Sequence, residues 1–137
     1  MEPTLIKTDN LKSLTMVREI FGPVITLYVY EDDDWESLCA SIDETTEYAL
    51  TGAIFCNDRK ALKRAEELLR YSAGNLYLNE KTTGAVVGQH PFGGNRSSGT
   101  NDKSGTWAHF SRFASARTIK DSFAEPVMEF LHPSNAS

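Results

Sequence analysis

The chain has 137 residues, of which 40% are hydrophobic and 24% are charged, and its formal net charge is -5. This length and composition suit one soluble globular domain and exclude an intrinsically disordered chain. The acidic balance argues against a general nucleic-acid-binding protein, which needs clustered lysine and arginine, and no apolar stretch approaches the ~20 residues of a membrane-spanning helix.

Apolar patterns in the first half predict alternating strands and helices. Residues 24–30 (Val-Ile-Thr-Leu-Tyr-Val-Tyr) are rich in β-branched and aromatic side chains, which is typical of a buried strand. Asp34 is placed to cap a helix whose apolar residues recur at helical spacing from Trp35 until Gly52 interrupts it. Residues 53–56 then form a second short apolar strand.

The pattern continues with one more helix and one more strand. Asp58 is expected to cap a helix with an apolar stripe over residues 61–69, and Gly74 is expected to end it. Residues 75–79 alternate polar and apolar side chains, as a strand does. Strands and helices in this alternating order predict an α/β fold with a parallel sheet flanked by helices.

The regular pattern stops at residues 80–106, a stretch that holds six of the nine glycines. A long loop inside a compact domain is commonly functional. Residues 110–120 are expected to form a final strand or arm, and the tail over 121–137 is expected to fray near its end.

The cysteines and histidines predict neither a nucleophile nor a metal site. Cys39 and Cys56 lie too far apart for a C-x-x-C motif, and both are expected to be reduced thiols in the core. A reactive thiolate needs an accessible, electropositive setting, which an apolar helix stripe and the end of a buried strand do not offer. No catalytic residue is therefore assigned. His90, His109 and His132 lack metal-ligand spacing.

A carboxylate, an aromatic residue and a Gly-Pro turn precede the first predicted strand, in residues 19–24 (Glu-Ile-Phe-Gly-Pro-Val). The turn is expected to hold Glu19 and Phe21 at the edge of the strand, where open α/β sheets bind ligands. A carboxylate accepts hydrogen bonds from ribose hydroxyls, and an aromatic ring packs on a flat nicotinamide. By composition alone, a surface glutamate and a core phenylalanine remain the alternative.

Residues 19–24 resemble the E-x-F-G-P motif of the aldehyde dehydrogenases. Three further segments match the order of that family: 51–55 (Thr-Gly-Ala-Ile-Phe), 73–75 (Ala-Gly-Asn) and 91–94 (Pro-Phe-Gly-Gly). The resemblance covers nearly the whole chain and implies the carboxyl-terminal part of an α/β catalytic domain. It also implies NAD as the cofactor, with its nicotinamide ribose held by Glu19 and its ring beside Phe21.

The loop at residues 83–103 resembles one subfamily, the glutamate semialdehyde (delta-1-pyrroline-5-carboxylate) dehydrogenases. The discriminating part is the run Ser-Gly-Thr-Asn-Asp-Lys at its end. In the resembled enzymes two consecutive backbone N–H groups hold the α-carboxylate of the substrate, a role that falls to Gly84 and Ala85 here. Phe92 matches the aromatic residue that packs on the aliphatic stem. Ala85 replaces the serine of some relatives, which keeps the backbone donor and loses a hydroxyl.

The resemblance implies the NAD-dependent oxidation of L-glutamate γ-semialdehyde, formed from pyrroline-5-carboxylate, to glutamate in proline catabolism. In the family the catalytic cysteine and its general base precede the E-x-F-G-P motif, and the 18 residues before Glu19 include no cysteine. The chain alone is therefore expected to be inactive. A non-catalytic truncated paralogue that binds intact subunits, and a segment of another semialdehyde dehydrogenase, are the alternatives.

The expected organisation is a partial catalytic domain over 1–109, with a substrate-anchoring loop at 80–106, an oligomerisation strand at 110–120 and a tail at 121–137. The expected partners are a small-molecule substrate with an α-carboxylate and further copies of the full enzyme, but no nucleic acid, membrane or metal. The resemblance implies the mitochondrial matrix in a eukaryote and the cytoplasm otherwise, although the chain carries no targeting segment. Its open sheet edges predict poor independent stability.

Overall fold

The structure, a computed structural model, describes residues 1–123. Its regular elements in chain order are β1 (Thr4–Thr8), α1 (Leu14–Val17), β2 (Val24–Tyr28), the 3-10 helix η1 (Asp32–Asp34), α2 (Trp35–Thr45), β3 (Tyr48–Ala49), β4 (Thr51–Ile54), α3 (Arg59–Leu68), β5 (Asn75–Leu78), β6 (Asn95–Arg96) and α4 (Trp107–Ser111). None of the helices in this part of the chain has the length and apolar character needed to cross a bilayer.

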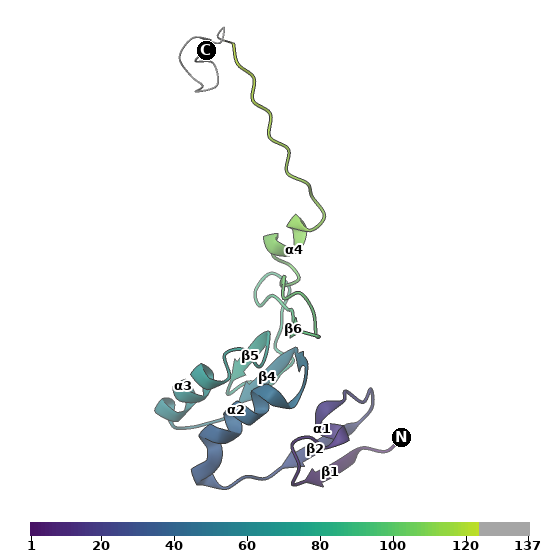
Figure 1. The fold of residues 1–137 in the computed structure, drawn as a ribbon, viewed down its shortest axis with the longest axis vertical. Coiled ribbons are helices and arrows are strands. Elements are labelled where there is room, and N and C mark those ends of the chain that lie inside the picture. The colour runs from purple at the N-terminus through teal and green to yellow at the C-terminus, as the bar shows by residue number, and fades with distance from the viewer. Residues whose placement is uncertain (124–137) are drawn as a thin grey trace, which may run out of the picture.

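The amino-terminal strands β1 and β2 form a parallel pair, with α1 on the connection between them (Figure 1). The sequence pattern does not predict β1, because only two of its five side chains are apolar and its identity as a strand depends on pairing with β2. The prediction that β2 is buried is wrong for this chain. Ile25 is 68% exposed and Leu27 44% exposed, because nothing in the described residues covers that face.

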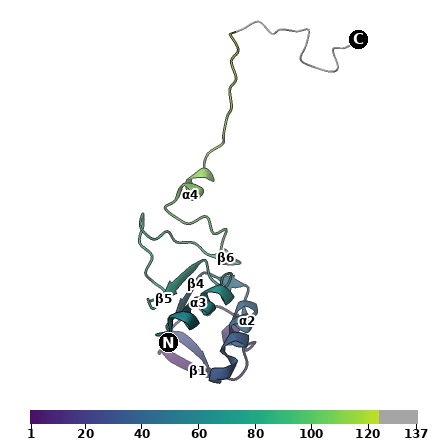
Figure 2. The same cartoon turned by 90° about the vertical axis from the view of Figure 1, so that its left-hand side faces the viewer.

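The second parallel pair, β4 and β5, encloses α3 in a β–α–β unit, and α2 packs against α3. Figures 1 and 2 show both helices beside this strand pair. The buried apolar residues come from these elements and their neighbours: Cys39, Ala49, Leu62, Ala65, Leu69 and Tyr77. The core of the described chain is therefore formed mainly by these two helices and the strands beside them.

The predicted α/β fold, with parallel strands and flanking helices, is confirmed. The single sheet expected from the three predicted strands is not formed in residues 1–123. There, β1 pairs with β2, β4 with β5, and β3 runs antiparallel to β6. A local pattern predicts that a segment is a strand, whereas its pairing partner depends on segments that are distant in sequence.

Two predicted helix ends are wrong, and both involve glycine. The helix that begins at Asp34 ends at Thr45, so that Gly52 lies inside β4 instead of interrupting the helix. The next helix ends at Leu68, well before Gly74. Its cap at Asp58 is confirmed, because that carboxylate accepts hydrogen bonds from two backbone N–H groups of the first turn.

Beyond the loop, the predicted strand over 110–120 is not present within the single chain. Helix α4 and the turn that follows it cover the start of this segment, and residues 115–123 follow an extended, exposed path (Figure 1). A segment that pairs with a second chain has no partner strand in one chain, so its role in oligomerisation stays a prediction. Most of the predicted tail at 121–137 lies outside the described residues.

Candidate functional site

The predicted carboxylate-binding residues lie at the start of the loop that connects β5 to α4. Gly84 and Ala85 lead into a tight antiparallel turn in which the His90 N–H donates to the Val86 carbonyl at 2.7 Å. Gly88 forms the tip of this turn with φ +77°, a left-handed conformation that favours glycine. The local sequence thus folds into a compact turn directly after the two predicted donors.

The backbone of Gly84 packs on the ring of Tyr77, a buried residue of β5. A Cβ at Gly84 would lie 3.0 Å from a ring atom of Tyr77, so glycine permits this approach. On another side the Tyr77 ring contacts His90, with 5.0 Å between the ring centroids. Among residues 1–123, the N–H groups of Gly84 and Ala85 make no backbone hydrogen bond. Two consecutive donors are therefore available to an anion.

The predicted aromatic residue, Phe92, is 39% exposed and is held through its backbone. Its carbonyl accepts a hydrogen bond from the Ser104 N–H at 2.8 Å, which joins the middle of the glycine-rich stretch to its carboxyl-terminal part. The Asn75 side chain donates to the Pro91 carbonyl at 3.0 Å and accepts from the Gly93 N–H at 3.1 Å. The peptide groups on both sides of Phe92 are thus bound by one buried asparagine at the start of β5.

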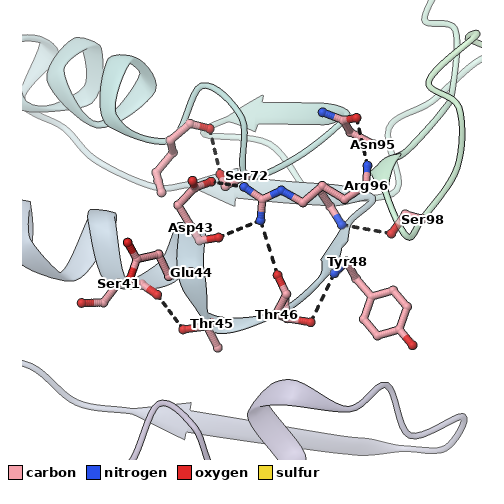
Figure 3. Close-up of polar contacts among 12 residues, drawn as sticks. Ser41, Asp43, Glu44, Thr45, Thr46, Tyr48, Ser72, Asn95, Arg96 and Ser98 are labelled. Atoms are coloured by element: carbon pink, nitrogen blue, oxygen red, sulfur yellow. Dashed lines mark hydrogen bonds and ion pairs between the residues drawn. The ribbon is translucent and has the colours of Figure 1, made fainter.

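A second set of contacts ties the same loop to the end of α2 (Figure 3). The Arg96 guanidinium lies 2.5 Å from a carboxylate oxygen of Asp43 and donates to the Asp43 carbonyl at 2.7 Å and the Thr46 carbonyl at 3.4 Å. The last carbonyl groups of a helix have no hydrogen-bond donors within the helix, and the Arg96 guanidinium provides such donors here. The Ser98 hydroxyl accepts a hydrogen bond from the N–H of buried Ala49 at 3.0 Å.

The predicted cofactor residues lie between α1 and β2. Glu19 lines a cavity of about 480 Å³ whose walls also include residues of α1, α2, β4 and the loop residue Ser98. Phe21 is 95% exposed. A carboxylate beside a cavity of this size fits the paired hydroxyls of a ribose, and an exposed aromatic ring fits a flat nicotinamide. The residues present are therefore compatible with a dinucleotide.

The structure brings the predicted residues together in two groups. Gly84, Ala85 and Phe92 belong to one loop, and none of them lines the cavity that includes Glu19. Sequence reasoning missed Asn75, which links the loop to the core. The sequence marks Asn75 only as part of the Ala-Gly-Asn segment and as a polar residue at the first position of an alternating strand, and neither signal shows that it binds the loop.

The two cysteines differ in their surroundings, and only Cys39 is buried. Burial, with a smaller effect of the nearby Glu36 carboxylate, raises the pKa of the Cys39 thiol, so that it stays protonated at neutral pH. The prediction that Cys56 ends a buried strand is wrong, because β4 ends at Ile54 and Cys56 is only half buried. Its Sγ lies 3.5 Å from the Asp58 carbonyl.

Comparison with known proteins identifies relatives along nearly the whole chain. Residues 1–119 match the sequence profile of the Aldehyde dehydrogenase family. Delta-1-pyrroline-5-carboxylate dehydrogenase of Agaricus bisporus is 56% identical over 135 residues, which cover 98% of this chain and 24% of that protein. The mitochondrial delta-1-pyrroline-5-carboxylate dehydrogenase of Dictyostelium discoideum is 51% identical, covering 97% of this chain and 24% of its own length.

Solved structures give the same result. The crystal structure of the Delta-pyrroline-5-carboxylate dehydrogenase from Mycobacterium tuberculosis, bound with NAD and cobalamin, superposes with a TM-score of 0.78 at 43% identity. The match covers 98% of this chain and 25% of that one. The chain thus spans about a quarter of the length of the curated relatives it matches.

Proposed function

Because this chain belongs to the aldehyde dehydrogenase family, we propose that it is a segment of an NAD-dependent enzyme that oxidises L-glutamate γ-semialdehyde to glutamate in proline catabolism. The observation that carries this proposal is the pair of consecutive N–H groups at Gly84 and Ala85, which make no backbone hydrogen bond in the described chain. Such a pair suits a substrate with a carboxylate. The names of the relatives support this choice of substrate.

Each predicted site residue has a distinct task in this proposal. Gly84 and Ala85 bind the α-carboxylate through their backbone, and Phe92 packs on the aliphatic stem, so that the aldehyde end lies at a set distance from the anchored end. Glu19 accepts hydrogen bonds from the nicotinamide ribose, and Phe21 lies beside the ring. NAD, when bound, accepts the hydride that the aldehyde carbon loses. The nucleophile and general base are expected from other parts of the enzyme.

We further propose that the full enzyme is a homo-oligomer and that it lies in the mitochondrial matrix in a eukaryote. The exposed apolar side chains after the loop support the first part. Trp107 and Phe113 are each 80% exposed, and Ile119 is 72% exposed, as expected for a segment that another subunit covers. The relative from Dictyostelium, whose name includes "mitochondrial", supports the second part.

The test of this function uses the full-length enzyme that carries these residues. NADH formation is measured with glutamate γ-semialdehyde and with succinic semialdehyde, which has a carboxylate but no α-amino group and a different length. We expect a higher kcat/KM for glutamate γ-semialdehyde. An equal or higher kcat/KM for succinic semialdehyde would contradict the substrate and favour another semialdehyde dehydrogenase. The 137-residue chain alone is expected to form no NADH.

A non-catalytic protein that binds intact subunits is the second candidate, because the same exposed apolar segment at 107–123 can associate with another chain. Co-expression of the 137-residue chain with a full-length relative distinguishes the two. The partner is a full-length relative from which the corresponding segment has been deleted. Stable co-purification with this partner, without recovery of its NADH formation, would support the non-catalytic candidate. Restored turnover in that partner would support the enzymatic one.

A further inference from the structure

Lys103 ends the run of residues that resembles one subfamily, and its side chain is turned into the protein. Its ammonium donates to the Gly74 carbonyl, to the Asn75 side-chain oxygen at 3.1 Å and to the Gly93 carbonyl at 3.0 Å. An ammonium has three N–H donors and no acceptor. All three donors are therefore used by neutral oxygens, and no ion pair involving Lys103 is found within residues 1–123.

Partial burial of this ammonium carries an electrostatic cost. Desolvation lowers the pKa of the Lys103 ammonium from its usual value. A lysine side chain is long and flexible enough to reach water from most positions near a surface. Its retention among three oxygens therefore implies that these contacts offset the lost hydration.

The shape of the preceding run directs Lys103 inward. Asn101 and Lys103 both have left-handed backbones, with φ of +58° and +55°. Asp102, between them, points the other way and accepts hydrogen bonds from the Thr100 hydroxyl at 2.6 Å and from the Arg112 guanidinium at 2.9 Å. The two neighbouring charged side chains thus point in different directions: the Asp102 carboxylate contacts Arg112, directly after α4, and the Lys103 ammonium contacts the start of β5.

Lys103 and Asn75 together bind the chain on both sides of Phe92. Asn75 is 3% exposed, and its amide oxygen accepts from both the Lys103 ammonium and the Gly93 N–H. Its amide nitrogen donates to the Pro91 carbonyl. The Gly93 carbonyl accepts from Lys103. The backbone position of Phe92 therefore depends on two side chains that lie 28 residues apart in sequence.

We propose that Lys103 and Asn75 are positioning residues for substrate recognition, which hold the Phe92 ring in place against the aliphatic stem of the bound semialdehyde. This inference rests on the proposed function, because it assumes that Phe92 contacts the substrate. It gives a physical reason for a lysine at this position. Three oxygens from two segments, the start of β5 and the loop at Gly93, suit a donor with three N–H groups, and the planar guanidinium of arginine offers its donors in a rigid fork of different geometry.

The test compares two variants of the full-length enzyme. Lys103→Met removes the ammonium and keeps an unbranched stem, and Lys63→Met makes the same change at an exposed position of α3. For Lys103→Met we expect the KM for glutamate γ-semialdehyde to rise about ten- to hundredfold, the order of effect of a displaced contact group. The KM for NAD should stay within about twofold of wild type, because Glu19 and Phe21 lie elsewhere. Lys63→Met should match wild type.

A purely structural role would give a different result. Loss of folded enzyme lowers the apparent kcat for every aldehyde, including propanal, and leaves each KM unchanged. That outcome, or a Lys103→Met enzyme with the wild-type KM for glutamate γ-semialdehyde, would overturn the proposal. If wild-type enzyme does not oxidise glutamate γ-semialdehyde at all, the proposed function fails instead.

Two further measurements do not depend on the folding of Lys103→Met. Asn75→Asp keeps an oxygen acceptor for Lys103 and Gly93, removes the donor to the Pro91 carbonyl and adds a carboxylate charge that the Lys103 ammonium can pair with. Its KM should therefore rise in the same direction by a smaller factor. In wild-type enzyme, the Gly93 amide should be protected from hydrogen exchange relative to the Val87 amide, since Val87 is 90% exposed and makes no backbone hydrogen bond in the described chain. Equal exchange rates would overturn the proposal.

Discussion

Replacement of Gly74 by alanine tests the close approach between β5 and the glycine-rich loop. A Cβ at this position would lie 2.8 Å from the Gly94 Cα and 3.0 Å from a side-chain oxygen of Asn101, and it would overlap the Gly93 carbonyl oxygen. Two of these three atoms belong to the backbone and cannot rotate away. Alanine therefore forces the loop to move away from the strand.

The size of the effect follows from three contributions. Overpacking of a close contact costs about 1–3 kcal/mol. Displacement of the loop weakens roughly two hydrogen bonds, those of Lys103 and Asn75, at about 1 kcal/mol each. The lower entropy of the unfolded alanine chain offsets about 1 kcal/mol of this loss. We therefore expect Gly74→Ala to lower the free energy of unfolding by about 2–4 kcal/mol, measured by urea unfolding of the protein that carries these residues.

Gly88→Ala is the matched control. Gly88 has a left-handed backbone, with φ +77°, but no atom lies within 4 Å of the position of its Cβ. Its replacement costs only backbone strain, which is about 1–2 kcal/mol for an L-residue before the same entropic offset. Gly74 has no left-handed φ, so its effect must come from contact. If Gly74→Ala destabilises the protein no more than Gly88→Ala does, the reasoning about the close approach is refuted.

Three further predictions concern single contacts. Ser98→Ala leaves the buried N–H of Ala49 without its acceptor and should lower the free energy of unfolding, measured in urea, by about 1–3 kcal/mol. An unchanged free energy of unfolding would show that the contact is dispensable. Asp58→Ala removes a helix cap with two hydrogen bonds and should lower the free energy of unfolding by about 1 kcal/mol. The Asp34 carboxylate makes no cap hydrogen bond, so Asp34→Ala should lower it by less. A lower melting temperature for Asp34→Ala than for Asp58→Ala would contradict this. A threonine hydroxyl, and then a guanidinium, hold the pKa of Asp102 below its usual value, so its stabilisation is complete above about pH 4 and is lost as the pH falls further. The stability difference between wild type and Asp102→Asn should therefore shrink below that pH, and a difference that does not change with pH would argue against the contact.

The elements that could be predicted are those whose cause is local. The cap at Asp58 lies two and three residues from the N–H groups it accepts, and β5 is recognisable from its own alternation. The resemblance to aldehyde dehydrogenases is also confirmed, because four motifs in order carry it. The roles of Glu19, Phe21 and the carboxylate-binding pair stay predictions.

The predictions that failed depended on distant segments. Gly52 and Gly74 have the local properties of helix ends, but Gly52 is part of β4 and Gly74 permits a close approach to the loop. The predicted single sheet is divided, because β2 finds its partner in β1, which has no clear strand pattern of its own.

By itself, the sequence determined the family, the α/β class and the place of the candidate substrate loop, since each of these follows from neighbouring residues or from motifs in order. Only the tertiary structure decided how that loop is held. The motif that ends at Lys103 indicates the subfamily but not the task of this side chain, which becomes visible only when the fold brings it to Gly74 and Asn75, residues 29 and 28 positions away. A hydrogen bond requires two atoms within about 3 Å, and that distance is a property of the folded chain, which no spacing along the sequence records.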